Sequence, residues 1–150
     1  MDTKKIIKAA EAEIGYKEIP ANSNKTKFGK WFGWDGVAWC AIFVSWVYDK
    51  AGYPLGNIGW PKGYAGCQSG YAYFKKKGWI TKKPVEGDIV LFDWNGDGRF
   101  DHKGIYVKHL TANTFQSIEG NTSMTNQSNG GEVMRRERKY NMAIFVHPNI

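Results

Sequence analysis

The first part of the chain carries apolar side chains at the three- and four-residue spacing of an amphipathic helix. Asp2 can cap the start of this helix, and Gly15 is suited to end it. A helix of this kind packs its apolar stripe against the rest of the protein. The apolar positions are Ile6, Ile7, Ala10 and Ile14.

A second helix is predicted from Trp39 to Lys50, stopped at Gly52. Its residues are apolar nearly all round, which is typical of a central buried helix. The segment before it, residues 16–37, is rich in Asn, Gly, Lys and Trp and is expected to be a loop. A third helix is predicted over residues 64–77, although two glycines within it lower its helix propensity.

After Pro84 the pattern changes to short strand-like segments separated by Gly, Asn and Asp turns. Helices first and an antiparallel meander afterwards predict an α+β fold, with N-terminal helices packed on a sheet of about five strands. No repeat or linker divides the sequence, so we expect residues 1–150 to form a single domain. The predicted strands are residues 88–92, 104–109, 114–118, 133–139 and 143–147.

Hydrophobic residues make up 42% and charged residues 23% of the chain, which indicates a globular protein rather than a disordered one. The seven Trp, eight Tyr and eight Phe exceed what a small core needs, so some are expected to line a groove. The net charge of +7 favours polyanionic partners, and the basic residues include the run Arg135-Arg136 with Arg138-Lys139. Such partners include nucleic acid, anionic lipid and an anionic cell wall, and nucleic acid is the least favoured because no nucleic-acid-binding motif accompanies the basic residues.

The N-terminus lacks the apolar core of a signal peptide, and the longest apolar stretch, residues 37–48, is too short to span a bilayer. We therefore expect a monomer that is made in the cytoplasm without a signal peptide and does not insert into membranes. Cys40 and Cys67 are too few for a disulfide framework. Cys67 is expected to be a small buried hydrophobic residue.

Cys40 stands at the mouth of the second apolar helix, where the N–H groups of the first turn favour a thiolate, the nucleophilic form. Far downstream, His102 opens an apolar strand and Glu119 ends the next one. A cysteine, a histidine and an acid distant in sequence are the parts of a thiol hydrolase. Each alone has a simpler explanation: core packing for the cysteine, a surface position for the histidine and a turn for the acid.

Five segments in chain order resemble the CHAP family, the cysteine, histidine-dependent amidohydrolase/peptidase domains of the papain-like superfamily. The resemblance covers essentially the whole chain and is of the phage endolysin or autolysin type. It implies a papain-like fold and peptidoglycan hydrolysis, at the amide between muramic acid and the stem peptide or at a peptide bond. The segments are Gly15-Tyr16-Lys17-Glu18 with Asn22-Ser23-Asn24, Trp39-Cys40-Ala41 with Phe43-Val44-Ser45-Trp46, residues 84–92, Asp101-His102-Lys103-Gly104-Ile105 and Ile118-Glu119-Gly120-Asn121.

By this resemblance Cys40 attacks the carbonyl carbon, His102 carries the proton to the leaving amine, and Glu119 orients the imidazole. Asn121 stands where the family often has a supporting polar group, and Trp39, beside the nucleophile, is expected to bind substrate. The backbone N–H of Cys40 would contribute to the oxyanion hole.

Lys103 departs from the family, because many relatives carry a small apolar residue after the histidine. We expect Lys103 to affect wall binding rather than the chemistry. Two other functions remain open: an amidase acting on small peptide–polyamine conjugates, and a non-catalytic module whose aromatic side chains stack on wall glycan.

One loop matches the first nine positions of a calcium-binding loop. Several endolysins of the family bind calcium just before the cysteine instead, but residues 31–36 contain a single acid, so that site is expected to be absent. The matching loop has Gly104 where a bidentate Glu would stand and no flanking helix, so a hairpin turn is the alternative. The candidate calcium ligands are Asp93, Asn95, Asp97, Asp101 and the carbonyl of Arg99.

Overall fold

The computed structural model describes residues 1–126 and 129–150, without the side chains of Cys67 and Ser69. The prediction for the Cys67 side chain therefore lies outside the described residues. Within them the chain forms four α-helices, one 3-10 turn (Tyr140–Met142) and one six-stranded antiparallel sheet. The helices are α1 (Thr3–Glu11), α2 (Lys27–Phe32), α3 (Cys40–Lys50) and α4 (Cys67–Lys76). The strands are β1 (Ile80–Thr81), β2 (Ile89–Phe92), β3 (His102–His109), β4 (Thr114–Thr122), β5 (Glu132–Lys139) and β6 (Ala143–Val146).

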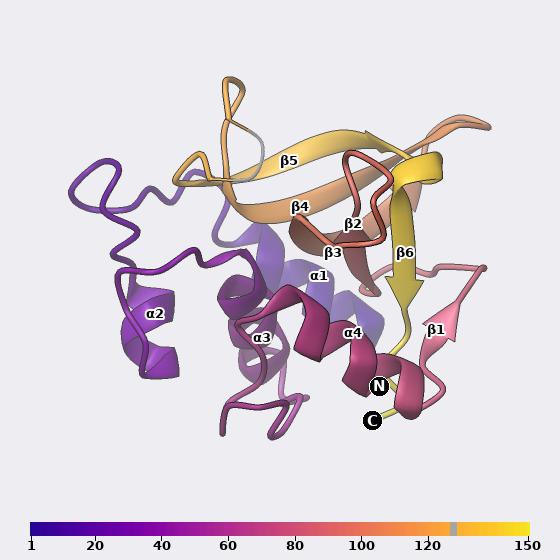
Figure 1. The fold of residues 1–150 in the computed structure, drawn as a ribbon, viewed down its shortest axis with the longest axis horizontal. Coiled ribbons are helices and arrows are strands. Elements are labelled where there is room, and N and C mark those ends of the chain that lie inside the picture. The colour runs from indigo at the N-terminus through magenta and orange to yellow at the C-terminus, as the bar shows by residue number, and fades with distance from the viewer. Residues whose placement is uncertain (127–128) are drawn as a thin grey trace.

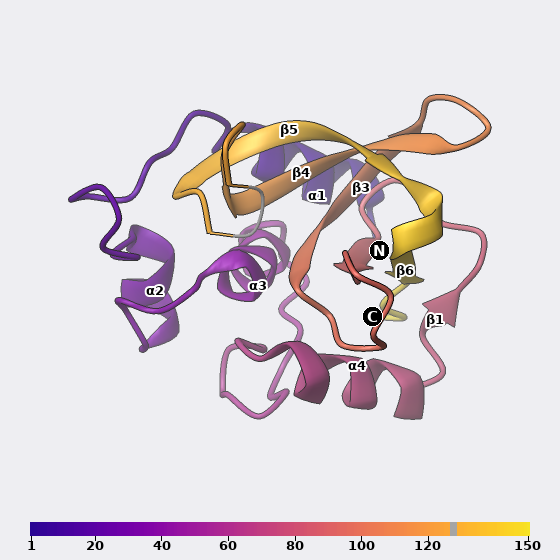
Figure 2. The same ribbon diagram turned by 45° about the horizontal axis from the view of Figure 1, so that its top comes forward.

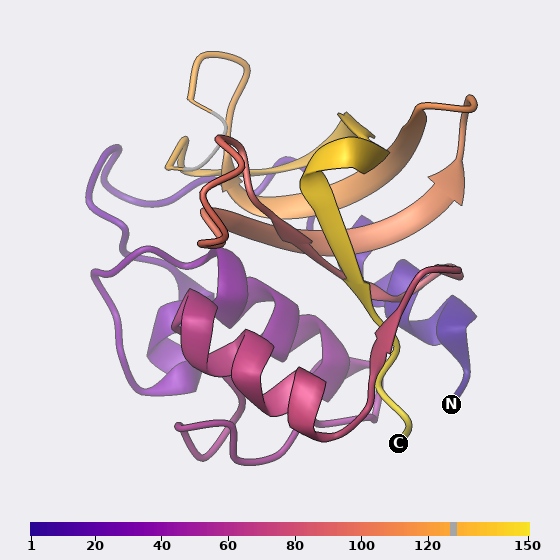
Figure 3. The same cartoon turned by 45° about the vertical axis from the view of Figure 1, so that its right-hand side comes forward.

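The strands are ordered β1-β6-β2-β3-β4-β5, and the helices gather below the curved sheet (Figure 1). Helix α3 lies at the centre, against β3 and β4 on one side and against α1 and α2 on the other. The long strands β4 and β5 run side by side along one edge of the sheet (Figure 2), and α4 lies below the sheet beside α3 (Figure 3). The predicted α+β fold is confirmed.

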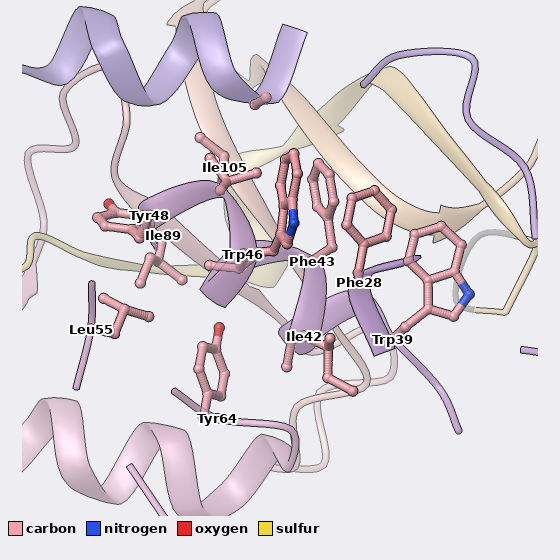
Figure 4. Close-up of a cluster of buried hydrophobic side chains, with 14 of the residues drawn as sticks. Phe28, Trp39, Ile42, Phe43, Trp46, Tyr48, Leu55, Tyr64, Ile89 and Ile105 are labelled. Atoms are coloured by element: carbon pink, nitrogen blue, oxygen red, sulfur yellow. The ribbon is translucent and has the colours of Figure 1, made fainter. Parts of the chain in front are cut away.

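Helix α3 is central because it is apolar on every side, as predicted from the sequence. All its residues from Cys40 to Tyr48 are buried. Aromatic side chains fill the space between α2 and α3: the ring of Phe28 stacks on Trp39 at 5.5 Å and meets Phe43 edge-on at 5.2 Å (Figure 4). Much of the high aromatic content is thus used in the core, and it fixes the N-terminal end of α3.

The sheet is buried on both faces at β2, whose side chains alternate between two hydrophobic clusters. Ile89 and Leu91 join the large core that surrounds α3. Val90 and Phe92 join a smaller cluster that also contains Phe115. The alternation gives each neighbouring strand one face toward the helices and one face away from them.

All five predicted strands are present, and the sixth, β1, is a two-residue strand paired with β6. The three predicted helices are also found. Helix α2 was not predicted and lies within the expected loop of residues 16–37. Thr26 caps this six-residue helix by accepting a hydrogen bond from Gly29 N, and Gly33 ends it with a left-handed φ of 97°. A helix this short has no periodic apolar pattern, so its two caps were its only signal in the sequence.

Candidate active site

Cys40 is the first residue of α3, and its side chain is 6% exposed. Burial by itself raises the pKa of a thiol. The Lys103 ammonium, the His102 imidazole and the backbone N–H of Ala41 act against burial and lower the pKa of Cys40 to about 6. Lys103 makes the largest of these contributions and the backbone N–H at the helix start the smallest, so the helix start alone does not account for the lowered pKa.

His102, the first residue of β3, is fully buried. Its ring stacks on Phe92 at 5.9 Å and on Trp94 at 6.0 Å, and its Nε2 lies 2.9 Å from Oε1 of Glu119. Among the described residues, Nδ1 has no hydrogen-bond partner, which leaves this nitrogen for proton exchange. Burial lowers the pKa of His102, but Cys40 and Glu119 favour the imidazolium and raise it to about 9.

Glu119 lies within β4, fully buried between His102 and the guanidinium of Arg138. Nε of Arg138 donates to Oε2 at 2.8 Å, and Nη2 donates to Oε1 at 2.6 Å. The hydroxyl of Ser117 also donates to Oε2. Burial raises the pKa of Glu119, but the bonds from Arg138 and His102 outweigh it and hold the pKa at about 2. The carboxylate is ionised at every physiological pH.

Two glycines let the elements of the site approach each other. A Cβ on Gly104 would lie 2.7 Å from Cγ of Glu119, so only glycine leaves room for the Glu119 side chain beside β3. A Cβ on Gly120 would lie 2.7 Å from Phe43 of α3. The glycines that follow His102 and Glu119 in the family-like segments therefore have a steric reason.

Cys40, His102 and Glu119 are thus brought together from α3, β3 and β4. Since the pKa of Cys40 is below that of His102, proton transfer from sulfur to imidazole is favourable, and the pair exists as thiolate and imidazolium near neutral pH. Glu119 stabilises the imidazolium and fixes which ring nitrogen faces it. Such an arrangement can attack a carbonyl carbon and protonate a leaving amine.

Sequence reasoning missed two cations of the site. Arg138 was placed in a basic surface run, but it is 6% exposed and its guanidinium lies 4.8 Å from the ring centre of Trp94. Lys103 was expected to affect wall binding, but it is 1% exposed and its Nζ lies 3.9 Å from Sγ of Cys40. Alternation along β3 was the available signal for Lys103, because residues two apart share a face and Ile105 is a core residue.

The side chain of Trp39, for which substrate binding was expected, lies inside the core. The indole is fully buried, and its Nε1 donates to Oε2 of Glu18 at 3.1 Å. Trp39 instead packs the N-terminal end of α3 against the first loop. The indole can be buried in the core because Glu18 accepts the hydrogen bond of its one polar atom inside the protein.

Asn121 is also buried, but it organises the connection from β4 to β5 rather than His102. Its backbone is left-handed, with φ of 57°. Its Oδ1 accepts from Gly131 N at 3.1 Å, and its Nδ2 donates to Oδ1 of Asn129 at 3.0 Å. Asn suits this position because its short polar side chain tolerates left-handed backbone and bonds locally. The structure thus shows a role in the turn, and the supporting role toward the histidine stays a prediction.

The expected calcium loop is closed by its own hydrogen bonds. Asp93 accepts from Gly96 N at 3.0 Å and Gly98 N at 2.8 Å, and Asp101 accepts from Trp94 N at 2.9 Å.

The other expected ligands of the loop follow the same pattern. Asp97 accepts from Arg99 N at 2.9 Å, and the Asn95 amide is best oriented with its nitrogen toward Asp93 and Asp97. In the part of the chain that the structure describes, no three His, Cys, Asp or Glu side chains are grouped so that they could hold a metal ion. This arrangement is that of the alternative, a turn closed by its own hydrogen bonds, and calcium binding by the loop stays a prediction.

The sequence model of the CHAP domain family matches residues 31–121, more than half of the chain. The solved structures that are similar to this chain include an endolysin and a second bacterial protein. The wild-type endolysin LysIME-EF1 superposes with a TM-score of 0.53 at 12% identity, over 97% of this chain and 64% of that protein. A protein from Staphylococcus aureus described as similar to lipoprotein, NLP/P60 family, gives 0.50 at 17% identity, over 98% of this chain and 42% of the other. Among curated protein sequences, none matches significantly.

The TM-scores show a shared fold, and at identities this low they show nothing beyond the fold. The structures therefore confirm the predicted papain-like fold, and the sequence model shows the family. The matched segment contains Cys40, His102, Glu119 and Asn121. The chain spans less than two thirds of the length of either similar protein. In the described residues, no helix is long and apolar enough to cross a membrane.

Proposed function

The chain belongs to the CHAP domain family, and we propose that it is a peptidoglycan hydrolase that uses Cys40 as its nucleophile. The bond cleaved is an amide: either the N-acetylmuramoyl-L-alanine bond, which makes the protein an amidase, or a peptide bond of the stem or cross-bridge, which makes it an endopeptidase. It acts at the bacterial cell wall, where anionic wall polymers attract its basic surface.

One observation carries the proposal: the fold brings the buried Cys40 thiol beside the His102 imidazole, whose other nitrogen lies 2.9 Å from the Glu119 carboxylate. The pKa of Cys40 is about 6 and that of His102 about 9, so both groups are ionised at neutral pH. Buried pairs with perturbed and opposed pKa values are characteristic of active sites. A cysteine that only packs the core has no need of this environment, because burial alone would keep it neutral.

In the acylation step, the thiolate of Cys40 attacks the carbonyl carbon of the amide and forms the C–S bond. The carbonyl π pair moves to oxygen, and the Cys40 backbone N–H at the start of α3 is positioned to stabilise this charge. His102 then gives its Nδ1 proton to the amide nitrogen as the C–N bond breaks. The amine leaves, and a thioester on Cys40 remains.

In the deacylation step, the now neutral imidazole of His102 takes a proton from water while the water oxygen attacks the thioester. Collapse of this second intermediate releases the carboxylic acid and regenerates the thiolate and the imidazolium. Glu119 stays ionised throughout, because Arg138 and Ser117 bind its carboxylate. Its part is to hold the ring and to stabilise the positive charge at the start and end of each cycle.

The test is digestion of purified peptidoglycan, followed by turbidity and by mass spectrometry of the products. We expect new amine and carboxyl ends at a single type of amide bond. Cys40→Ala and Cys40→Ser should lose activity by at least about a thousandfold while remaining folded. Cys67→Ala, the matched cysteine control, should retain it. Wall clearance by Cys40→Ala would show that the nucleophile is wrong.

The same experiment separates the two other functions. An amidase of small peptide–polyamine conjugates would leave walls turbid and release amine from the conjugate. A non-catalytic wall-binding module would bind walls without releasing products, and alkylation of Cys40 would leave that binding intact. Either result would reject the proposal.

A further inference from the structure

Lys103 is buried at the reacting sulfur. Its side chain is 1% exposed, and Nζ lies 3.9 Å from Sγ of Cys40, within hydrogen-bond reach of a sulfur acceptor. Lysine is rarely buried without an anionic group nearby, because removing an ammonium from water is costly. A thiolate at Cys40, in contact with the ammonium, is one such group.

The register of the sheet shows why Lys103 points to α3. Lys103 pairs directly with Leu91 of β2, and directly opposite residues of antiparallel strands share a face. Leu91 belongs to the core around α3, while His102 pairs with Phe92 of the opposite cluster. Two consecutive residues of β3 therefore approach the start of α3 from different faces of one strand.

The charged groups near the sulfur determine how easily the Cys40 thiol ionises. Two charged groups act directly on Cys40, the ammonium of Lys103 and the imidazolium of His102. Glu119 from β4 and Arg138 from β5 act on it through the imidazole. With the thiolate formed, these five groups carry three positive and two negative formal charges. Of these groups, Lys103 adds a positive charge next to the sulfur itself, which favours an anion there.

We propose that Lys103 is a further catalytic residue of the hydrolase proposed above, whose ammonium contacts the Cys40 sulfur and holds it as a thiolate before substrate binds. The inference rests on that proposed function for its role in turnover, but the state of the sulfur can be measured without any wall substrate. Lys103 remains protonated through the reaction and exchanges no proton. As the C–S bond forms, negative charge leaves the sulfur for the carbonyl oxygen beside it.

Lys103 and His102 stabilise the thiolate over different parts of the cycle. His102 must lose its proton to the leaving amine, so its stabilisation of the thiolate ends within each cycle. Lys103 keeps its charge, so it can stabilise the thiolate again when the thioester is hydrolysed. Among the charged groups that act directly on the sulfur, Lys103 is the one whose charge is constant over the cycle.

The test is the rate of Cys40 alkylation by iodoacetamide from about pH 4 to about pH 10, followed on the Cys40 peptide by mass spectrometry. We expect Lys103→Met to raise the midpoint of this profile by at least about one pH unit and to slow alkylation near pH 6 roughly tenfold. Lys103→Arg keeps the charge and should stay near the wild-type midpoint. Lys108→Met, an exposed lysine of the same strand, is the matched control and should change nothing.

A midpoint unchanged in folded Lys103→Met would overturn the inference, whether or not the protein digests peptidoglycan. If Lys103→Met does not fold, NMR of the wild type decides the matter. The Lys103 ε-carbon signal should then shift at the pH where Cys40 ionises, and this step should vanish in Cys40→Ala. A signal that is the same across that pH range in both proteins would reject contact between the ammonium and a thiolate.

Discussion

Arg138 binds the carboxylate of Glu119 at two points inside the sheet, with donor–acceptor distances of 2.8 and 2.6 Å. Bidentate pairs of this kind fix orientation as well as charge. Because the same carboxylate also binds His102, Arg138 helps to determine where the imidazole lies. The site is thus a row of alternating charges from Arg138 through Glu119 and His102 to Cys40.

Arg138→Met should damage stability and activity together. It leaves the buried charge of Glu119 without its principal partner, and breaking such a pair typically costs roughly 3–5 kcal/mol. Arg135→Met is the matched control on the same strand, because Arg135 pairs with Glu11 where both side chains are substantially exposed. That change should cost less than about 1 kcal/mol. Urea unfolding measures both.

A double-mutant cycle distinguishes the pair from general damage to the sheet. In the Glu119→Gln background, Arg138→Met should lower the free energy of unfolding clearly less than in the wild type. The buried carboxylate that would be left without its partner is absent there. Equal costs in the two backgrounds would mean that Arg138 supports the fold independently of Glu119.

Hydrolysis should follow a bell-shaped pH profile set by the thiolate–imidazolium pair. Activity should fall below about pH 6 as Cys40 gains a proton, and above about pH 9 as His102 loses one. Glu119→Gln removes a carboxylate that raises the pKa of His102, so the alkaline limb should move to lower pH. Initial rates of wall digestion across pH measure both limbs. An alkaline limb at the same pH in Glu119→Gln would show that deprotonation of His102 does not cause it.

The sequence was sufficient to predict the α+β class, because helix periodicity and strand alternation are local properties. The positions of Cys40 and His102 at the start of α3 and of β3 were also predictable, since the apolar pattern of each element is plain. Lys103 and Arg138 were not, because a buried cation depends on an anion that the fold brings from elsewhere. The Cys40 sulfur that Lys103 contacts is 63 residues away in sequence, and the Glu119 carboxylate reaches Arg138 through the register of β4 and β5.

Trp39 shows the converse limit of sequence reasoning. Its position beside the nucleophile favoured substrate contact, but the partner of its indole nitrogen, Glu18, lies 21 residues earlier. Only the folded first loop brings that carboxylate to the ring. Whether an aromatic side chain near a nucleophile faces substrate or core is therefore decided by tertiary packing, which a local pattern does not contain.

Association with the cell wall should weaken as salt rises. The net charge is +7, and attraction between exposed charges is screened over about 8 Å at physiological ionic strength and about 3 Å at 1 M. Sedimentation of catalytically inactive Cys40→Ala with purified walls across a salt series measures binding without digestion. The triple variant Lys75→Gln, Lys76→Gln, Lys77→Gln, which removes an exposed basic cluster, should bind less at low salt and equally at high salt. Binding that ignores salt would indicate a specific glycan or peptide pocket.

Calcium removal tests the loop from Asp93 to Asp101, where the sequence and the structure favour different answers. The spacing of oxygen side chains resembles a calcium loop. In the structure, however, Asp93 accepts hydrogen bonds from two backbone N–H groups of the loop and Asp101 accepts one from Trp94. A loop already closed by these bonds needs no ion to order it.

We therefore expect a chelator to leave both the melting temperature and wall lysis unchanged. Asp93→Ala should lower stability by about 1–3 kcal/mol with or without calcium, because it removes an ionised acceptor from two N–H groups. Asp97→Ala, which removes a single such bond, is the matched control and should cost less. A fall in melting temperature on chelation that calcium restores in the wild type but not in Asp93→Ala would establish the ion instead. Since the loop ends beside His102, that result would also make the position of the histidine strand dependent on calcium.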